Sequence, residues 1–145
     1  MICHIVNITG QIMPVQKICD MAHRYGIRVV VDGAHAFGHI QFSIQDLHCD
    51  YYGTSLHKWL NVPLGAGFLY VKKDQQKNIQ PQIMSWGWGE EYDEFKGSTQ
   101  LKSESRFVNI FQWQGTRDMS AFLAIPSAIK FVEKNSWKKR QAVSY

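Results

Sequence analysis

The segment IRVVVDGAH, residues 27–35, decides the fold. Its first part, Ile27–Val31, is rich in β-branched residues, which is typical of a strand buried on both faces of a parallel sheet. The run ends at Asp32 and Gly33, a polar residue followed by a turn residue. In an open parallel sheet, ligands bind at the carboxyl ends of the strands. The segment therefore predicts an α/β sheet with polar chemistry at its carboxyl edge.

A strand and a helix are expected before this segment. Residues 2–6, ICHIV, form a short apolar run that ends in the turn sequence NITG. Pro14 suits the start of a helix and Gly26 suits its end. Between them, four apolar residues share one helical face: Val15, Ile18, Cys19 and Ala22. Strand, helix and strand at this spacing predict a βαβ unit with a right-handed crossover.

Further elements are expected along the rest of the chain. Residues 50–54 and 67–71 are short strand patterns, and residues 74–105 lack a clear period and indicate a long loop. Residues 107–113 are interpreted as a short strand. After Gly115 the pattern becomes helical, with Asp118 as N-cap and with Pro126 kinking or restarting the helix. One apolar stripe is expected on it: Ala121, Ile125, Ala128, Ile129 and Val132.

Composition limits the classes of protein. The 145 residues are 45% hydrophobic and 19% charged, as in ordinary globular proteins, and the formal net charge is +4. The basic run 138–140 fits a solvated helix face, so no nucleic-acid partner is inferred. No apolar run reaches the length of a membrane span and no signal peptide is evident. Three cysteines without a CxxC spacing predict reduced thiols in a cytoplasmic protein.

Both ends of the sequence look cut. Met1 leads directly into the first strand, and a helical pattern is still under way near Trp137. We expect residues 1–145 to be part of a longer protein, and we expect them to be poorly soluble and inactive by themselves.

Polar residues gather after three of the expected strands. Taken singly, each has a structural interpretation, because an aspartate caps turns, histidines pack at rims and a lysine extends its stem to solvent. Taken together, they could meet at one sheet edge. The candidates are Asn7 after the first strand, Asp32 and His35 after the second, and Ser55, His57 and Lys58 after the third.

This set of residues favours amine chemistry over a metal site. A desolvated lysine can act as a nucleophile and form a Schiff base with a carbonyl compound. A carboxylate suits the ring nitrogen of pyridoxal phosphate, and a serine and a histidine can donate to a phosphate. Zinc or iron on Asp32, His35 and His57 is the alternative, but the spacing matches no standard ligand pattern and Lys58 would repel the cation.

The motifs NITG, VVVDGAHAFG, DYYGTSLHKWL, PLGAGFLYV and QGTRD, in this order, resemble the aminotransferase class V family of fold-type I pyridoxal-phosphate enzymes. Within it, the DGAH, HKW and GTRD segments are most similar to the isopenicillin N epimerase-like branch. The resemblance implies the central part of a three-layer α/β/α large domain with a mostly parallel sheet. It also implies that residues 1–145 lack the family's N-terminal segment and its C-terminal small domain.

The resemblance implies roles for individual residues. Lys58 matches the lysine that forms the Schiff base, and Asp32 the acid that pairs with the pyridine nitrogen. His35 stands where desulfurases have glutamine, near the cofactor's phenolic oxygen. Asn7 matches an asparagine that reaches the same oxygen, Ser55 and His57 match contacts of the phosphate, and Thr116 matches a residue that reaches the phosphate in the neighbouring subunit of a homodimer.

The implied function is that of a pyridoxal-phosphate enzyme acting on a small amino acid or a derivative, of epimerase or lyase type. A cysteine desulfurase-like or selenocysteine lyase-like activity is the first alternative. In desulfurases the reactive cysteine lies in the absent C-terminal region, so Cys3, Cys19 and Cys49 are poor candidates for it. A non-catalytic fragment that only packs against or binds a partner is the alternative of another class.

Overall fold

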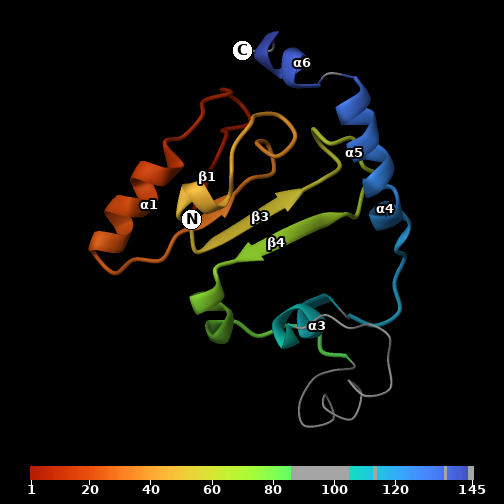
Figure 1. Cartoon of the computed structure of the whole chain (residues 1–145). Helices are drawn as coiled ribbons and strands as arrows, with labels where there is room; N and C mark the ends of the chain where they lie inside the picture. The colour runs from red at the N-terminus through yellow and green to blue at the C-terminus, as the bar shows by residue number, and fades with distance from the viewer. Residues whose placement is uncertain (86–104, 113, 136, 144–145) are drawn as a thin grey trace. The chain divides into compact units, whose positions relative to one another are not determined.

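A computed structural model of the chain describes residues 1–85, 105–112, 114–135 and 137–143. They fall into two compact units, one of Met1–Lys72 with Met119–Tyr145 and the other of Lys73–Asp118 (Figure 1). Within the described residues, no helix is both long enough and apolar enough to cross a membrane.

The first unit is built on a sheet of four strands in the order β1-β2-β3-β4. These are β1 (Ile2–Cys3), β2 (Val30–Asp32), β3 (Tyr51–Ser55) and β4 (Gly67–Val71). The first three strands are parallel, and β4 runs antiparallel to β3. The predicted α/β class and the mostly parallel sheet are confirmed. The first strand is shorter than the predicted 2–6, because the chain turns back and Ile5 pairs with Ile12.

The burial of the segment that decides the fold differs from the prediction. Val29 and Val31 are buried, but Val30 is 39% exposed and Ile27 is 58% exposed. The expectation of burial on both faces is therefore wrong for this chain. Side chains on a strand alternate between its faces, and only one face of β2 is covered by described residues.

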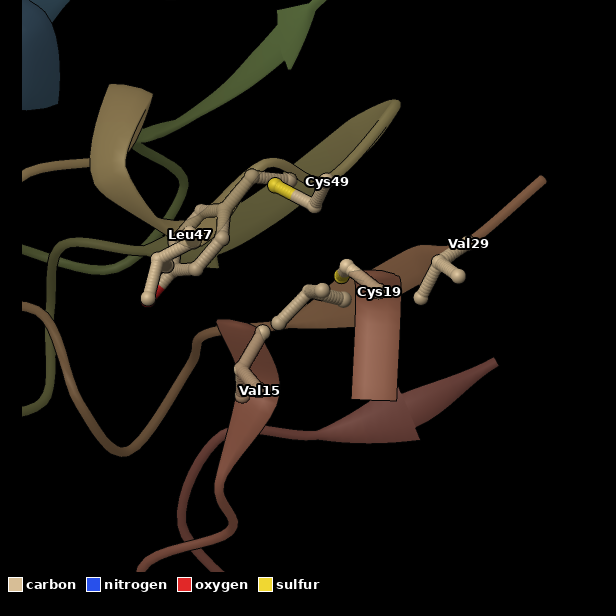
Figure 2. Close-up of a cluster of buried hydrophobic side chains, with 7 residues drawn as sticks. Val15, Cys19, Val29, Leu47 and Cys49 are labelled. Carbon is tan, nitrogen blue, oxygen red and sulfur yellow. The ribbon is translucent and has the colours of Figure 1, made fainter. Parts of the chain in front are cut away.

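Helix α1 (Val15–Arg24) connects β1 to β2 as predicted. Val15 and Cys19 are buried in the main core cluster, and Ala22 packs against it. Gly26 has a φ of +67°, which a glycine adopts without strain at a helix end. Figure 2 shows the cluster, whose members come from α1, from the 3-10 helix η1 (Gln45–Leu47), and from β2 and β3 with the residues just before them: Val15, Cys19, Val29, Val31, Leu47, Cys49 and Tyr52.

A second core cluster lies under the C-terminal helices of the same unit. It holds Leu56, Leu60, Val62, Ala66 and Ala121. Helix α4 (Ser120–Leu123) is followed by α5 (Ile125–Lys134), which has a proline in its first turn, so the predicted restart at Pro126 is confirmed. Helix α6 (Trp137–Val143) comes last.

Two predictions for these helices are wrong. The N-cap of α4 is Met119, with no side-chain capping bond, and not Asp118. The predicted apolar stripe packs against the second cluster except at Ile129, which is 43% exposed. The stripe crosses the break at Ala124 between α4 and α5, so helical spacing alone does not predict which of its residues are buried.

The second unit contains the 3-10 helix η2 (Lys73–Asn78) and helix α3 (Arg106–Gln112). The predicted strand at 107–113 is therefore wrong over 107–112, and Trp113 lies outside the described residues. Phe107, Ile110 and Phe111 are spaced for one helical face, and the two phenylalanine rings lie 4.5 Å apart. The predicted loop at 74–105 begins with η2, and its residues 86–104 lie outside the described residues.

Candidate functional site

Asp32 closes β2 and starts the turn that carries His35. Its Oδ1 accepts the backbone N–H of Ala34 at 2.9 Å, so one oxygen has the structural role of a turn residue. The turn continues with backbone bonds from Ala36 and Phe37 to the carbonyl of Gly33, at 2.9 and 3.2 Å. Within the part of the chain that the structure describes, Oδ2 has no hydrogen-bond partner. One carboxylate oxygen thus remains for a ligand.

Gly33 lies directly on a buried tyrosine. A Cβ at this position would lie 2.0 Å from Cζ of Tyr52 and 2.1 Å from its hydroxyl oxygen. Tyr52 is fully buried, and its hydroxyl lies 3.1 Å from Nδ1 of the buried His4. Burial lowers the pKa of His4 and raises that of Tyr52, so both are neutral at pH 7. The turn therefore rests on a packed, uncharged support.

Lys58 follows β3 in a second turn, which backbone bonds close. Leu56 N–H donates to the Ala66 carbonyl at 3.0 Å, and Val62 N–H donates to the Leu56 carbonyl at 3.2 Å. Leu56, Val62 and Ala66 all belong to the second core cluster. Lys58 is consequently half-buried on a segment whose apolar neighbours are fixed in the core.

The two turns meet at a contact between Lys58 and His35. Lys58 Nζ lies 2.9 Å from His35 Nε2. Burial and the neighbouring Lys58 lower the pKa of His35, with a smaller opposing effect from Asp32 and a further lowering by His39. His35 is therefore neutral at pH 7. A lysine ammonium only donates, so it donates to Nε2 and the ring proton of His35 lies on Nδ1.

The other predicted site residues have varied positions. Ser55 and His57 are half-buried at the end of β3, whereas Asn7 is exposed in the turn after β1. The structure shows no side-chain hydrogen bond from any of these three to Lys58 or His35 among the described residues. Thr116 is exposed and belongs to the second unit, so its position relative to this site is not defined.

Sequence reasoning missed two neighbours of the site. The rings of His39 and Trp59 are stacked, with centroids 3.8 Å apart and planes 14° apart. His39 Nδ1 also lies 3.2 Å from the backbone carbonyl of His35 and, as the only possible donor of this pair, carries a proton. A histidine four residues after His35 and a tryptophan directly after Lys58 were the available signals. The periodicity of the sequence cannot indicate that His39 and Trp59 stack, because the two residues come from different turns.

The arrangement can perform amine chemistry. A half-buried primary amine is held by a neutral acceptor, and a carboxylate with a free oxygen lies on the same turn as that acceptor. Within the described ranges, no group of three or more His, Cys, Asp or Glu side chains could hold a metal ion.

Comparisons with known proteins indicate the family of the chain. The aminotransferase class-V family profile matches residues 1–144. The chain is 40% identical over 131 residues to isopenicillin N epimerase of Amycolatopsis lactamdurans, covering 88% of this chain and 32% of that protein. It is 34% identical over 131 residues to hercynylcysteine sulfoxide lyase of Schizosaccharomyces pombe, covering 90% of this chain and 32% of that protein.

A solved structure gives the same fold. The apo structure of cysteine desulfurase from Thermococcus onnurineus NA1 superposes with a TM-score of 0.71 at 22% identity, covering 94% of this chain and 32% of that one. The chain thus spans about a third of the length of these relatives. The predicted family and its epimerase-like branch are confirmed, and the match over residues 1–144 shows that the chain belongs to the aminotransferase class-V family.

Proposed function

We propose that Lys58 is the residue that binds pyridoxal phosphate, in a protein that acts on an amino acid or a derivative through a lysine Schiff base, as an epimerase or a lyase. The observation that carries this proposal is the 2.9 Å contact between Lys58 Nζ and His35 Nε2, on the turn that also bears Asp32. The names of the relatives support the same chemistry.

The residues present fit this cofactor. The free Oδ2 of Asp32 suits a protonated pyridine nitrogen, and a neutral His35 suits the phenolic oxygen, which Asn7 would also reach. Ser55 and His57 offer a hydroxyl and an imidazole to the phosphate. When bound, the cofactor supplies an electron sink for a carbanion at the substrate's Cα.

Lys58 would then move the proton. Once it is free of the cofactor, its amine can accept the Cα proton of the substrate, and His35 Nε2 can keep the amine in place by a hydrogen bond. An epimerase returns a proton to the opposite face, whereas a lyase expels a side-chain group. The 40% identity to an isopenicillin N epimerase supports the first outcome.

A desulfurase-like or selenocysteine lyase-like reaction is the second candidate. It is supported by the 30% identity over 133 residues to L-cysteine desulfhydrase of Arabidopsis thaliana, which covers 90% of this chain and 26% of that protein. Incubation of the full-length protein with L-cysteine distinguishes the two candidates. Release of sulfide favours the lyase, and exchange of the Cα hydrogen with solvent deuterium without release favours the epimerase.

The assignment of Lys58 is tested by reduction of the cofactor-loaded, full-length protein with borohydride, followed by peptide mapping. We expect the pyridoxyl group on Lys58, its loss in Lys58→Ala, and no change in the control Lys17→Ala, which alters an exposed lysine of α1. A label on another lysine would refute the assignment. No label and no cofactor absorbance would favour the non-catalytic alternative.

We further propose a homodimer with composite sites, in which Thr116 reaches the phosphate of the neighbouring subunit. A cap for its own helix is the competing role, but the N-cap of α4 is Met119. Two inactive full-length variants, Lys58→Ala and Thr116→Ala combined with Gly115→Pro, are mixed under conditions of verified subunit exchange. Partial return of activity supports the composite site, and no return contradicts it.

A further inference from the structure

Helix α6 is tied to the turn that carries His35. Trp137 Nε1–H donates to the carbonyl of Gly38 at 2.7 Å, and Gln141 Nε2–H donates to the same carbonyl at 2.8 Å. Gln141 is only 8% exposed, and its own carbonyl oxygen accepts from Gln41. Two donors use both lone pairs of one carbonyl oxygen. The peptide group between Gly38 and His39 is therefore fixed from the side of α6.

The same glycine touches the segment that carries Lys58. Gly38 has a φ of +81°, and a Cβ there would lie 3.0 Å from both the Leu60 nitrogen and the Trp59 carbonyl carbon. Only a residue without a side chain allows this approach of two backbones. Gly38 is thus the place where α6, the turn after β2 and the turn after β3 meet.

His39 extends the connection to the site. It follows the fixed peptide group, stacks on Trp59 and contacts the carbonyl of His35. Trp59 in turn is the neighbour of Lys58 in the chain. The stacking of His39 on Trp59 joins the turn with His35 to the turn with Lys58, so movement of Gly38 would move the two turns relative to each other.

We propose that Trp137 and Gln141 of α6 are positioning residues that hold His35 against Lys58, acting through the carbonyl of Gly38. The effect is indirect, since both side chains donate to the carbonyl of Gly38. Only the functional consequence, that α6 influences the position of the Lys58 amine in the active site, rests on the proposed function. Its geometric part concerns this chain's own residues and needs no cofactor.

The competing role for α6 is simple stabilisation of the fold. The two roles differ in their effect on His35, which is faced by Lys58, Asp32 and His39. Loss of the connection would loosen the contact with Lys58 and admit water to the ring. We therefore expect the pKa of His35 to rise in both variants, because the desolvation that lowers it is partly relieved. Lost stability alone leaves this pKa unchanged in the folded protein.

The test measures deuterium exchange at the Cε1–H of His35 against pH by mass spectrometry, on the cofactor-free, full-length protein. The variants are Gln141→Ala and Trp137→Phe, and Lys138→Ala is the control at an exposed position of the same helix. We expect the rise in both variants and no change in the control. An unchanged pKa of His35 in either folded variant overturns the proposal.

Two provisions keep the outcome decisive. Trp137→Phe removes the N–H donor and keeps an aromatic side chain of most of the bulk, so it decides the matter if Gln141→Ala does not fold. Because the readout needs no cofactor, failure of Lys58 to bind pyridoxal phosphate would refute the proposed function and leave this measurement valid. A loaded protein with normal cofactor binding and an unchanged His35 pKa would refute the positioning role alone.

Discussion

Replacing Gly33 by alanine is the sharpest structural test of the site. The added Cβ would lie 2.0 Å from Cζ of Tyr52, whereas carbon atoms pack at roughly 3.5–4.0 Å. The ring or the turn must therefore shift by about 1.5 Å. Tyr52 is fully buried and its hydroxyl contacts His4, so it has no free space to move into.

The expected cost follows from two contributions. Overpacking a core costs about 1–3 kcal/mol, and loss of the Tyr52–His4 hydrogen bond adds about 1 kcal/mol. We therefore expect Gly33→Ala to lower the free energy of unfolding by about 2–4 kcal/mol. Urea denaturation followed by tryptophan fluorescence measures this change. Because the displaced turn carries His35, borohydride labelling of Lys58 should fall in the same variant.

A double-mutant cycle separates the clash from a general effect of alanine. Tyr52→Leu removes the outer part of the ring, which holds the atoms nearest to the added Cβ. In that background Gly33→Ala should cost less than about 1 kcal/mol, giving a coupling of about 2–3 kcal/mol. Equal costs in the two backgrounds would show that Tyr52 does not support the turn, and the reasoning from this contact would be refuted.

Three further predictions concern single side chains. Asp32→Ala should lower turnover roughly 10–100-fold, the equivalent of about 1.5–3 kcal/mol for a charged hydrogen bond, while cofactor occupancy changes less; near-normal turnover would leave Asp32 a turn residue only. Burial raises the pKa of Cys19 and Cys49 to about 11, so iodoacetamide at pH 7.5 should modify the exposed Cys3 and spare both until the protein unfolds; equal labelling by mass spectrometry would contradict this. Burial lowers the pKa of His4, so below pH 6.5 the unfolded chain binds more protons than the folded one, and the free energy of unfolding should decrease as the pH is lowered. The difference between the urea midpoints at pH 7.5 and pH 5 should be smaller in His4→Gln than in the unmodified chain, and an unchanged difference would exclude His4 as a cause.

The order of elements and the centre of the site could be predicted from sequence because both depend on local patterns. A strand is predicted by the apolar run before Asp32, and another by the short run before Ser55. Parallel strands place their carboxyl ends at one edge of the sheet. That edge brings His35 and Lys58 to 2.9 Å of each other, although they are 23 residues apart. The prediction needed only the direction of the strands.

The incorrect predictions arose where a local pattern fits two kinds of structure, or where contacts between residues far apart in the sequence determine the structure. Phe107 and Phe111 fit a short apolar run as well as a helix, and the spacing of four residues was the better signal. Ile129 has the helical spacing of a core residue, but its side chain is 43% exposed. The connection of Gln141 to Gly38 spans 103 residues, and no periodicity can indicate a single long-range hydrogen bond.

The contacts of Lys58 explain why a lysine occupies the middle of a packed domain. The group that lies 2.9 Å from Lys58 Nζ is not a carboxylate. The group that is found there is an imidazole, which burial and Lys58 itself keep neutral at pH 7. It fixes the position of the amine by a hydrogen bond without adding an attracting charge. The negative charge of the site is instead on Asp32, whose Oδ1 is engaged in its own turn and whose free oxygen is left for the ring nitrogen of the proposed cofactor. Lys58 and Asp32 thus lie on separate turns, and the close approach of Gly38 to the backbone of Trp59 and Leu60 joins these turns.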